Sequence, residues 1–317
     1  MDTSAPLPDW FNQIQHASAD HSALHHETSA SEFPYRYRLI WDPAADTEAV
    51  CQWLSKAGQE ISLCPLLRQN SLAGIELGCQ SPVPRPGVLS DRIEWLDVCN
   101  TLPSLSGPGL LVMDMDSTAI EIECIDELAK MAGKGDEVAE VTERAMQGEL
   151  DFEQSLRQRV AALKDADESI INALCQELPL MPGLEVMVKE LQSHGWQIAL
   201  ASGGFTPFVN YLRDKLSLTA AFANELVVDD GKLTGDVTGT VVDAQYKASV
   251  LSRLGVEFAI PHRQQVAIGD GANDIPMIQA AALGIAFHAK PKLKAEACAS
   301  IDNLDLRVLP YLLALKD

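Results

Sequence analysis

The sequence of 317 residues has 45 acidic and 24 basic side chains, a formal net charge of −21, and 47% of its residues are hydrophobic. The length predicts about two domains, the composition is that of a folded globular protein, and the acidic excess argues against binding to a nucleic-acid backbone. No apolar run approaches the roughly 18 residues that span a bilayer, and the acidic N-terminus lacks a secretory signal pattern. We therefore expect a cytoplasmic protein with no nucleic-acid or membrane partner.

Cysteine and histidine side chains give no convincing metal or disulfide pattern. The seven cysteines are dispersed without a C-x-x-C pair, which is typical of buried or unreactive thiols in a reducing compartment. His21 and His25 have the i, i+4 spacing that could hold a metal ion on a helix. Because no other ligand type converges on them, we expect the first 30 residues to form a loosely ordered leader.

The region after the leader predicts a small α+β domain. Residues 35–42 have the pattern of a strand, residues 47–61 that of an amphipathic helix, and residues 62–79 that of one or two further strands. The Pro-rich stretch 81–87 predicts the start of a linker. We therefore assign 1–105 to the leader, this domain and the linker. The domain resembles the small ligand-binding ACT domains, and a structural or dimerising role, as in a homodimer, is the alternative.

The pattern changes after residue 106 to strands that alternate with helices, which is typical of a parallel α/β sheet. The short apolar runs that predict these strands are 109–114, 196–202, 264–270 and 283–287. Residues 120–180 carry no comparable strand and predict helices, whereas residues 222–242 predict a hairpin that turns at Asp230-Gly231. Open parallel sheets bind ligands beyond the carboxyl ends of their strands, so polar side chains at those ends are the candidate site residues.

Two carboxylates follow the first of these strands. Asp114 and Asp116 are separated by one residue, so both can face a site at the strand end. Asp114 could attack a phosphorus atom as a nucleophile, and Asp116 could protonate the departing oxygen and then deprotonate the hydrolytic water. The alternative is that Asp114 only caps a following helix.

The next strand end and a later helix supply candidate phosphate ligands. Ser202 and the Gly203 amide lie beyond a strand, before a helix that begins at Thr206-Pro207. Lys247 falls in the first turn of a predicted helix, where the helix dipole disfavours a cation unless an anion is near. Each signal has an ordinary alternative, a common βα turn for the first and a solvated surface lysine for the second.

A third strand end supplies a candidate metal ligand. Asp270 follows the strand 264–270, with Asn273 and Asp274 beyond it. Attack of a carboxylate on a phosphomonoester dianion needs a hard cation to offset the repulsion, and Mg²⁺ prefers carboxylate oxygens and water. Helix capping is the alternative for Asn273 and Asp274, and for Asp274 it is compatible with a functional role.

The predicted helices between residues 120 and 180 also carry charged side chains. Glu123 lies near the start of an amphipathic helix, and Arg159 lies beside the apolar stripe of another. An unpaired arginine there would be costly, which points to a bound anion. An arginine whose charged end reaches solvent at the edge of the stripe is the alternative.

Taken together, these segments resemble the four motifs of the haloacid dehalogenase superfamily. The matching segments, in the same order, are DMDST (114–118), SGG (202–204), Lys247 and GDGAND (269–274). The resemblance covers residues 106–317 and implies a Rossmann-like parallel sheet with a helical C1-type cap at about 120–185. The second aspartate is similar to the phosphatase branch and implies an aspartyl-phosphate intermediate on Asp114.

Together with DMDST, the segments IECIDELA (122–129), EQSLRQRV (153–160), SGGF (202–205), DGKLTGDV (230–237) and GDGANDIPM (269–277) resemble the members of this superfamily that hydrolyse O-phospho-L-serine. This resemblance implies that Glu123 holds the substrate ammonium, that Arg159 holds its carboxylate, and that the phosphate is held by Ser202, Gly203, Lys247 and Asn273. It also implies Mg²⁺ held by Asp114, Asp270 and the backbone carbonyl of Asp116, although an oxygen-rich site also accepts Mn²⁺. The implied reaction is the last step of L-serine biosynthesis. The alternatives are hydrolysis of another small phosphomonoester and a regulatory binding module.

Overall fold

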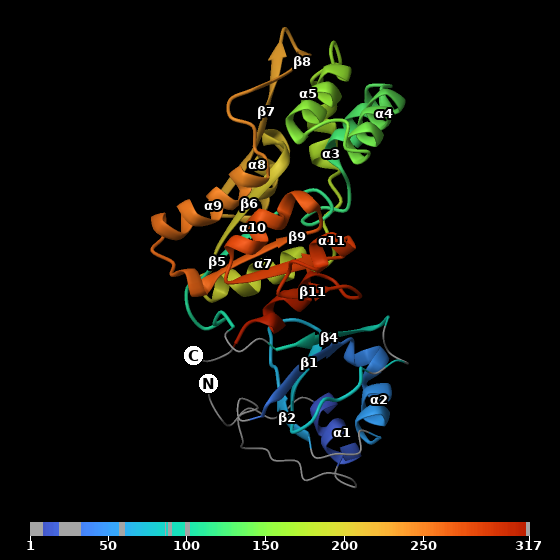
Figure 1. Cartoon of the computed structure of the whole chain (residues 1–317), viewed down its shortest axis with the longest axis vertical. Coiled ribbons are helices and arrows are strands. Elements are labelled where there is room, and N and C mark those ends of the chain that lie inside the picture. The colour runs from blue at the N-terminus through green and yellow to red at the C-terminus, as the bar shows by residue number, and fades with distance from the viewer. Residues whose placement is uncertain are drawn as a thin grey trace.

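The described residues of the chain form two separate β-sheets, which lie in different parts of an elongated molecule (Figure 1). The structure is a computed structural model and describes residues 9–18, 33–56, 61–85, 87, 91–98 and 102–314. None of the helices in these ranges has the length and apolar character needed to cross a membrane.

The N-terminal domain is a four-stranded antiparallel sheet in the order β2-β3-β1-β4, packed with two helices. Its elements are α1 (Asp9–Ser18), β1 (Tyr35–Trp41), α2 (Pro43–Leu54), β2 (Ile61–Pro65), β3 (Ala73–Cys79) and β4 (Ile93–Asp97). Helix α2 begins before the predicted residue 47 because Asp42 caps it, accepting the Ala44 N–H at 2.9 Å, and Pro43 fits its first turn.

Two predictions for this region are wrong. Phe11 and Ile14 of α1 are fully buried in the core of the N-terminal sheet, so this part of the leader is folded. The predicted linker contains β4, which pairs with β1 through residues such as Trp95 opposite Leu39. The apolar side chains of both segments supply the burial that holds them. His21 and His25 lie outside the described residues.

The second sheet has seven strands in the order β11-β10-β9-β5-β6-β7-β8. All neighbouring strands pair in parallel except β7 and β8. The strands are β5 (Leu110–Met113), β6 (Gln197–Phe205), β7 (Ala220–Asp229), β8 (Lys232–Thr238), β9 (Gln265–Gly269), β10 (Leu283–Phe287) and β11 (Ala299–Ile301). Strand β5 lies between β6 and β9. The predicted strands 109–114, 196–202, 264–270 and 283–287 correspond to β5, β6, β9 and β10, so they are confirmed.

Helices cover both faces of this sheet, which explains why its strands are continuous apolar runs. Leu111 and Met113 of β5 belong to one apolar cluster, whereas Leu110 and Val112 belong to a second cluster on the opposite face. The helices around the sheet are α7 (Leu184–Ser193), α8 (Thr206–Leu216), α9 (Ala244–Glu257), α10 (Ile275–Ala280) and α11 (Pro291–Lys294), with the 3₁₀ helices η3 (His262–Gln264), η4 (Ala272–Asp274) and η5 (Leu306–Leu312).

The cap is a group of four helices between β5 and α7, and in Figure 1 it lies at the end of the molecule opposite the N-terminal sheet. These helices are α3 (Cys124–Met131), α4 (Gly135–Met146), α5 (Phe152–Ala162) and α6 (Ser169–Gln176). The β7–β8 hairpin supports the cap, because Leu233 exchanges backbone hydrogen bonds with Asp165 and Ala166 after α5. The hairpin turns at Asp230 and Gly231, both with positive φ, as predicted.

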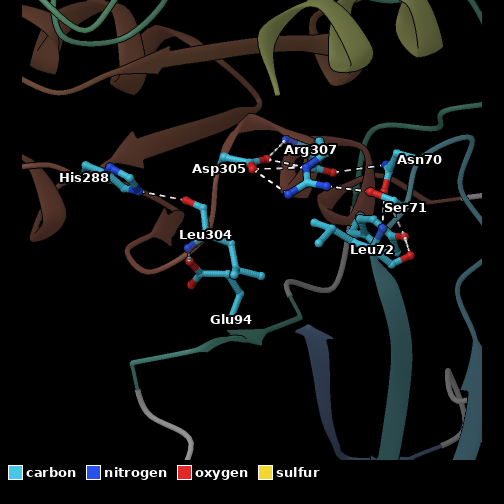
Figure 2. A network of polar contacts seen from close by, with 9 residues as sticks. Asn70, Ser71, Leu72, Glu94, His288, Leu304, Asp305 and Arg307 are labelled. Carbon is cyan, nitrogen blue, oxygen red and sulfur yellow. Dashed lines mark hydrogen bonds and ion pairs between the residues drawn. The ribbon is translucent and has the colours of Figure 1, made fainter. Parts of the chain in front are cut away.

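The N-terminal sheet forms buried hydrogen bonds with the segment that follows β11. Glu94 of β4, which is 2% exposed, accepts the backbone N–H groups of Asp302, Asn303 and Leu304. The Leu304 carbonyl in turn lies 2.7 Å from Nε2 of His288, in the loop after β10 (Figure 2).

Two arginines form further hydrogen bonds between the segment after β11 and the N-terminal domain. Arg307, held by Asp305, donates to the Ser71 hydroxyl (Figure 2). Buried Arg38 of β1 donates to the carbonyls of Tyr311 and Leu313. Because backbone groups that lack a partner are costly when buried, these contacts fix the position of the two sheets relative to each other.

Candidate active site

The carboxyl ends of β5, β6 and β9 open into one cavity of about 450 Å³, which the cap helices α3, α4 and α5 close from the other side. Its lining includes most of the predicted site residues: Asp114, Asp116, Glu123, Arg159, Gly203, Asp270 and Asn273. Polar side chains from the ends of three strands and from two cap helices therefore meet in one cavity.

The floor of the cavity is a buried ion-pair cluster. Asp114 follows β5, and its Oδ2 lies 2.7 Å from Nζ of Lys247 in the first turn of α9. The same Nζ lies 2.8 Å from Oδ1 of Asp274. Burial alone would lower the pKa of Lys247, but the two carboxylates raise it above its ordinary value. The lysine is therefore a permanent cation beside the Asp114 carboxylate.

Asp116 lies two residues further on, within a tight turn in which the Met115 carbonyl accepts the N–H groups of Thr118, Ala119 and Ile120. Its Oδ1 accepts the Cys124 N–H at 3.2 Å. Burial, and next the charge of Glu123, raise the pKa of Asp116 to about 7. A carboxyl group with that pKa is part protonated at neutral pH, as a group that alternates between acid and base must be.

The end of β6 forms the third part of the site. Ser202 is fully buried, and its hydroxyl accepts the Gly204 N–H at 2.9 Å. A side chain at Gly203 would meet the Phe152 ring at 3.0 Å, and one at Gly204 would meet Oδ2 of Asp116 at 2.9 Å. Gly204 therefore allows the backbone to approach Asp116 closely, and Gly203 allows it to approach the Phe152 ring of the cap. Ser202 itself lies beneath the cavity lining.

Three carboxylates lie close enough together to hold a metal ion. Oxygen atoms of Asp114, Asp270 and Asp274 all lie within 4.8 Å of one another. Asp274 accepts from Lys247 and from the Gly271 N–H at 3.1 Å, and Asp114 accepts from Lys247 and from the Met115 N–H at 2.7 Å, so Asp270 has the freest oxygens of the three. Burial and the neighbouring Asp274 raise the pKa of Asp270 to about 6. A compact set of hard oxygen donors with excess negative charge fits Mg²⁺.

The cap contributes one acidic and one basic side chain to the opposite wall. Glu123 is exposed and accepts the Ser117 hydroxyl at 2.8 Å. Arg159 of α5 is half-buried, and its Nε is buried without a hydrogen-bond partner among the described residues. Burial lowers the pKa of Arg159, but a guanidinium stays charged in proteins. A buried unpaired donor on a cavity wall is costly unless a ligand accepts from it.

Asp274 has a larger role than helix capping alone suggested. It is fully buried and pairs with Lys247, a contact between residues 27 positions apart. Asn224 of β7 was not a candidate at all, yet its amide contacts the carbonyls of Gly203 and Gly204. The GDGAND segment indicated Asp274 in the sequence, whereas the strand pattern around Asn224 gave no indication of its role.

Comparisons with known proteins agree with this geometry. The sequence model of the haloacid dehalogenase-like hydrolase family matches residues 109–282. The chain is 56% identical over 215 residues to a phosphoserine phosphatase of Haemophilus influenzae, covering 68% of this chain and 68% of that protein. It is 59% identical over 196 residues to one of Vibrio cholerae, covering 62% of this chain and 60% of that protein.

A solved structure extends the similarity to the N-terminal sheet. The unliganded structure of a probable phosphoserine phosphatase from Vibrio cholerae has a TM-score of 0.77 and 39% identity, and the match covers 94% of this chain and 92% of that one. The chain therefore belongs to the haloacid dehalogenase-like hydrolase family. The two sequence relatives above are named phosphoserine phosphatases, and the solved structure is a probable one, so the predicted fold and the predicted enzyme class, a phosphatase, are confirmed.

Proposed function

We propose that this protein hydrolyses O-phospho-L-serine to L-serine and phosphate. The observation that carries the proposal is the buried Nε of Arg159, which has no hydrogen-bond partner in the part of the chain that the structure describes and which shares its cavity with Glu123 and Asp114. The opposite charges are Arg159 for a substrate carboxylate, Glu123 for an ammonium, and Lys247 beside Asp114 for a phosphate. The names of the relatives support the same substrate.

The phosphoryl end supports a two-step displacement. Asp114 is the nucleophile: its carboxylate attacks phosphorus, the bond to the serine oxygen breaks, and an aspartyl-phosphate forms. Asp116 donates its proton to the leaving serine oxygen, which its raised pKa allows. The deprotonated Asp116 then takes a proton from the water that attacks the aspartyl-phosphate, which releases phosphate and regenerates Asp114.

Ser202, the Gly203 amide, Lys247 and Asn273 would hold the phosphate oxygens, with Lys247 fixed against Asp114 at 2.7 Å. Mg²⁺ would be held by Asp114, Asp270 and the backbone carbonyl of Asp116, and when bound it would offset the repulsion between carboxylate and phosphate. Lys247 supplies positive charge at the same place. Glu123 and Arg159 hold the amino-acid end and align the serine oxygen with Asp116.

We also propose the boundaries that the sequence predicts: an N-terminal region 1–105, a catalytic domain 106–317, and a cap at about 120–185. The position in L-serine biosynthesis, the cytoplasmic location and the homodimer stay predictions. The N-terminal region makes the buried contacts with the 302–313 segment described above, which favours a structural role for it.

The test is phosphate release from O-phospho-L-serine with and without Mg²⁺, beside p-nitrophenyl phosphate as a substrate that has no amino-acid group. We expect magnesium-dependent release that Asp114→Asn abolishes. Removal of Mg²⁺ with a chelator should stop the reaction, and its return should restore it. Hydrolysis of p-nitrophenyl phosphate without hydrolysis of O-phospho-L-serine would contradict the substrate and leave the phosphatase in place.

A further inference from the structure

The strand that carries the phosphate ligands leaves its regular pairing at the point where they begin. Strand β6 pairs with β7 through Ala199, Leu200 and Ala201, and the register then shifts before Phe205 pairs with Asn224. The backbone of Ser202, Gly203 and Gly204 therefore bulges out of the ladder toward the cavity. Its carbonyl groups need partners from elsewhere, because buried backbone oxygens without partners are costly.

One side chain supplies those partners. Asn224 is 1% exposed, and its Nδ2 donates to the Gly203 carbonyl at 2.8 Å and to the Gly204 carbonyl at 3.3 Å. Its Oδ1 accepts the Val242 N–H at 2.8 Å. The donor and the acceptor of the amide are thus both used, by two different segments of the chain.

The second segment leads directly to the lysine of the site. Val242 precedes Asp243, which caps α9 by accepting the Tyr246 N–H at 2.8 Å, and Lys247 follows in the first turn. The Val242 carbonyl also lies 3.9 Å from the place that a Cβ at Gly203 would take. The bulge of β6 and the start of α9 therefore lie side by side, with Asn224 bonded to both.

We propose that Asn224 is the positioning residue of the phosphate site, holding the Gly203–Gly204 backbone and the start of α9 in the register that lets Gly203 and Lys247 bind the same phosphoryl group. The proposal rests on the proposed function for the phosphoryl chemistry and not for the amino-acid end of the substrate. Asn224 does not touch the substrate, and it acts through the two segments that do.

The test variant is Asn224→Asp, which keeps the shape and the acceptor for Val242 but replaces the donor with an oxygen facing two carbonyl oxygens. With p-nitrophenyl phosphate we expect kcat to fall about 10²-fold, the effect of a small misplacement of reacting groups. The inhibition constant of inorganic phosphate should rise about tenfold, as for loss of one charge-assisted contact. Inhibition by L-serine, which would contact only Glu123 and Arg159, should not change.

The matched control is Asn172→Asp, the same substitution at an exposed residue of α6, which should leave all three quantities unchanged. If Asn224→Asp does not fold, Asn224→Ala removes the same donor without burying a charge and is held to the same criteria. Wild-type kcat and phosphate inhibition in a folded Asn224 variant would overturn the proposal, as would equal weakening of phosphate and L-serine binding. If wild-type protein cleaves p-nitrophenyl phosphate but neither cleaves O-phospho-L-serine nor binds L-serine, the substrate assignment fails, and the kcat and phosphate measurements still decide the role of Asn224.

Discussion

The two ends of the active-site cavity are built differently. At the phosphoryl end, charged groups are buried and paired within the protein, as Lys247 is between Asp114 and Asp274. At the cap end, Glu123 is exposed and Arg159 has a buried nitrogen with no partner among the described residues. The first end stands on the buried strands of a sheet, and the second stands on the helices of the cap.

This difference separates chemistry from substrate choice. A charge cluster that is complete before the substrate arrives costs no reorganisation when the phosphoryl group reacts. The Arg159 nitrogen that has no partner among the described residues would gain one only when a ligand with a complementary group binds, so a substrate without that group leaves it unpaired and is disfavoured. Substitutions at the two ends should therefore differ in which substrates and which kinetic constants they affect.

The largest effect is expected for Asp114→Asn. The amide keeps the size of the side chain but is a poor nucleophile, so kcat should fall about 10⁴-fold or more with every phosphomonoester. Phosphate release from O-phospho-L-serine and from p-nitrophenyl phosphate measures it. A variant that lost only one of these activities would show that the phosphoryl end also selects the substrate. The division between a catalytic end and a selective end would then be wrong.

Lys247→Met should cost both activity and stability. It leaves Asp114 and Asp274 buried without their cation, and removal of one partner from a buried ion pair typically costs about 3–5 kcal/mol. Urea denaturation in the presence of a metal chelator measures the free energy of unfolding. Lys134→Met, at a partly exposed lysine that pairs with Glu137 on the cap surface, is the control and should leave the unfolding midpoint where it was. Equal midpoints for the two variants would contradict a stabilising role for the buried cluster.

Arg159→Ala should affect the amino-acid substrate alone. Loss of a charged hydrogen bond to the substrate carboxylate is worth about 1.5–3 kcal/mol, so KM for O-phospho-L-serine should rise about 10–100-fold. The p-nitrophenyl phosphate reaction is the internal control, and we expect it unchanged. Arg159→Lys should restore activity only in part, because a lysine cannot form the two-pronged contact with a carboxylate. A parallel loss with both substrates would place Arg159 in the phosphoryl chemistry.

Glu123→Gln should give the smallest effect, about a two- to fivefold rise in KM for O-phospho-L-serine. KM for 3-phosphoglycerate, which has a hydroxyl in place of the ammonium, should not rise. The same variant tests the electrostatics of Asp116, whose pKa is raised first by burial and then by Glu123. Without that charge the pKa falls, the proton of the general acid is lost at lower pH, and the alkaline decline of kcat/KM should move to lower pH. A decline that stays in place or moves to higher pH speaks against this role for Glu123.

The sequence predicted the parts of the site that depend on local pattern. Asp114 and Asp270 could be found because each follows a short apolar strand, and strand ends of a parallel sheet converge. Asn224 could not be found in this way, because its role depends on a bulge in the neighbouring strand β6. A single polar residue within a strand does not indicate that such a bulge exists. The pairing of Asp274 with Lys247 likewise depends on how α9 packs against the loop after β9.

The N-terminal domain was predicted less well for a related reason. Phe11 and Ile14 lie in a segment rich in serine and histidine, so the two buried side chains of α1 were hidden by the composition around them. Strand β4 follows a Pro-rich stretch and pairs only because β1 offers an open edge to it. Such long-range pairing is decided by the partner and not by the segment itself.

The contacts between the N-terminal sheet and the residues after β11 affect how the chain folds during synthesis. Gly74 of β3 packs directly against the Tyr311 ring, where any side chain at 74 would collide with it, and Arg38 of β1 bonds the carbonyls of Tyr311 and Leu313. These partners leave the ribosome only after all the strands of the catalytic sheet. The N-terminal sheet is translated before the catalytic sheet but completes its packing after it, because its open face lacks those contacts until synthesis has passed Leu313.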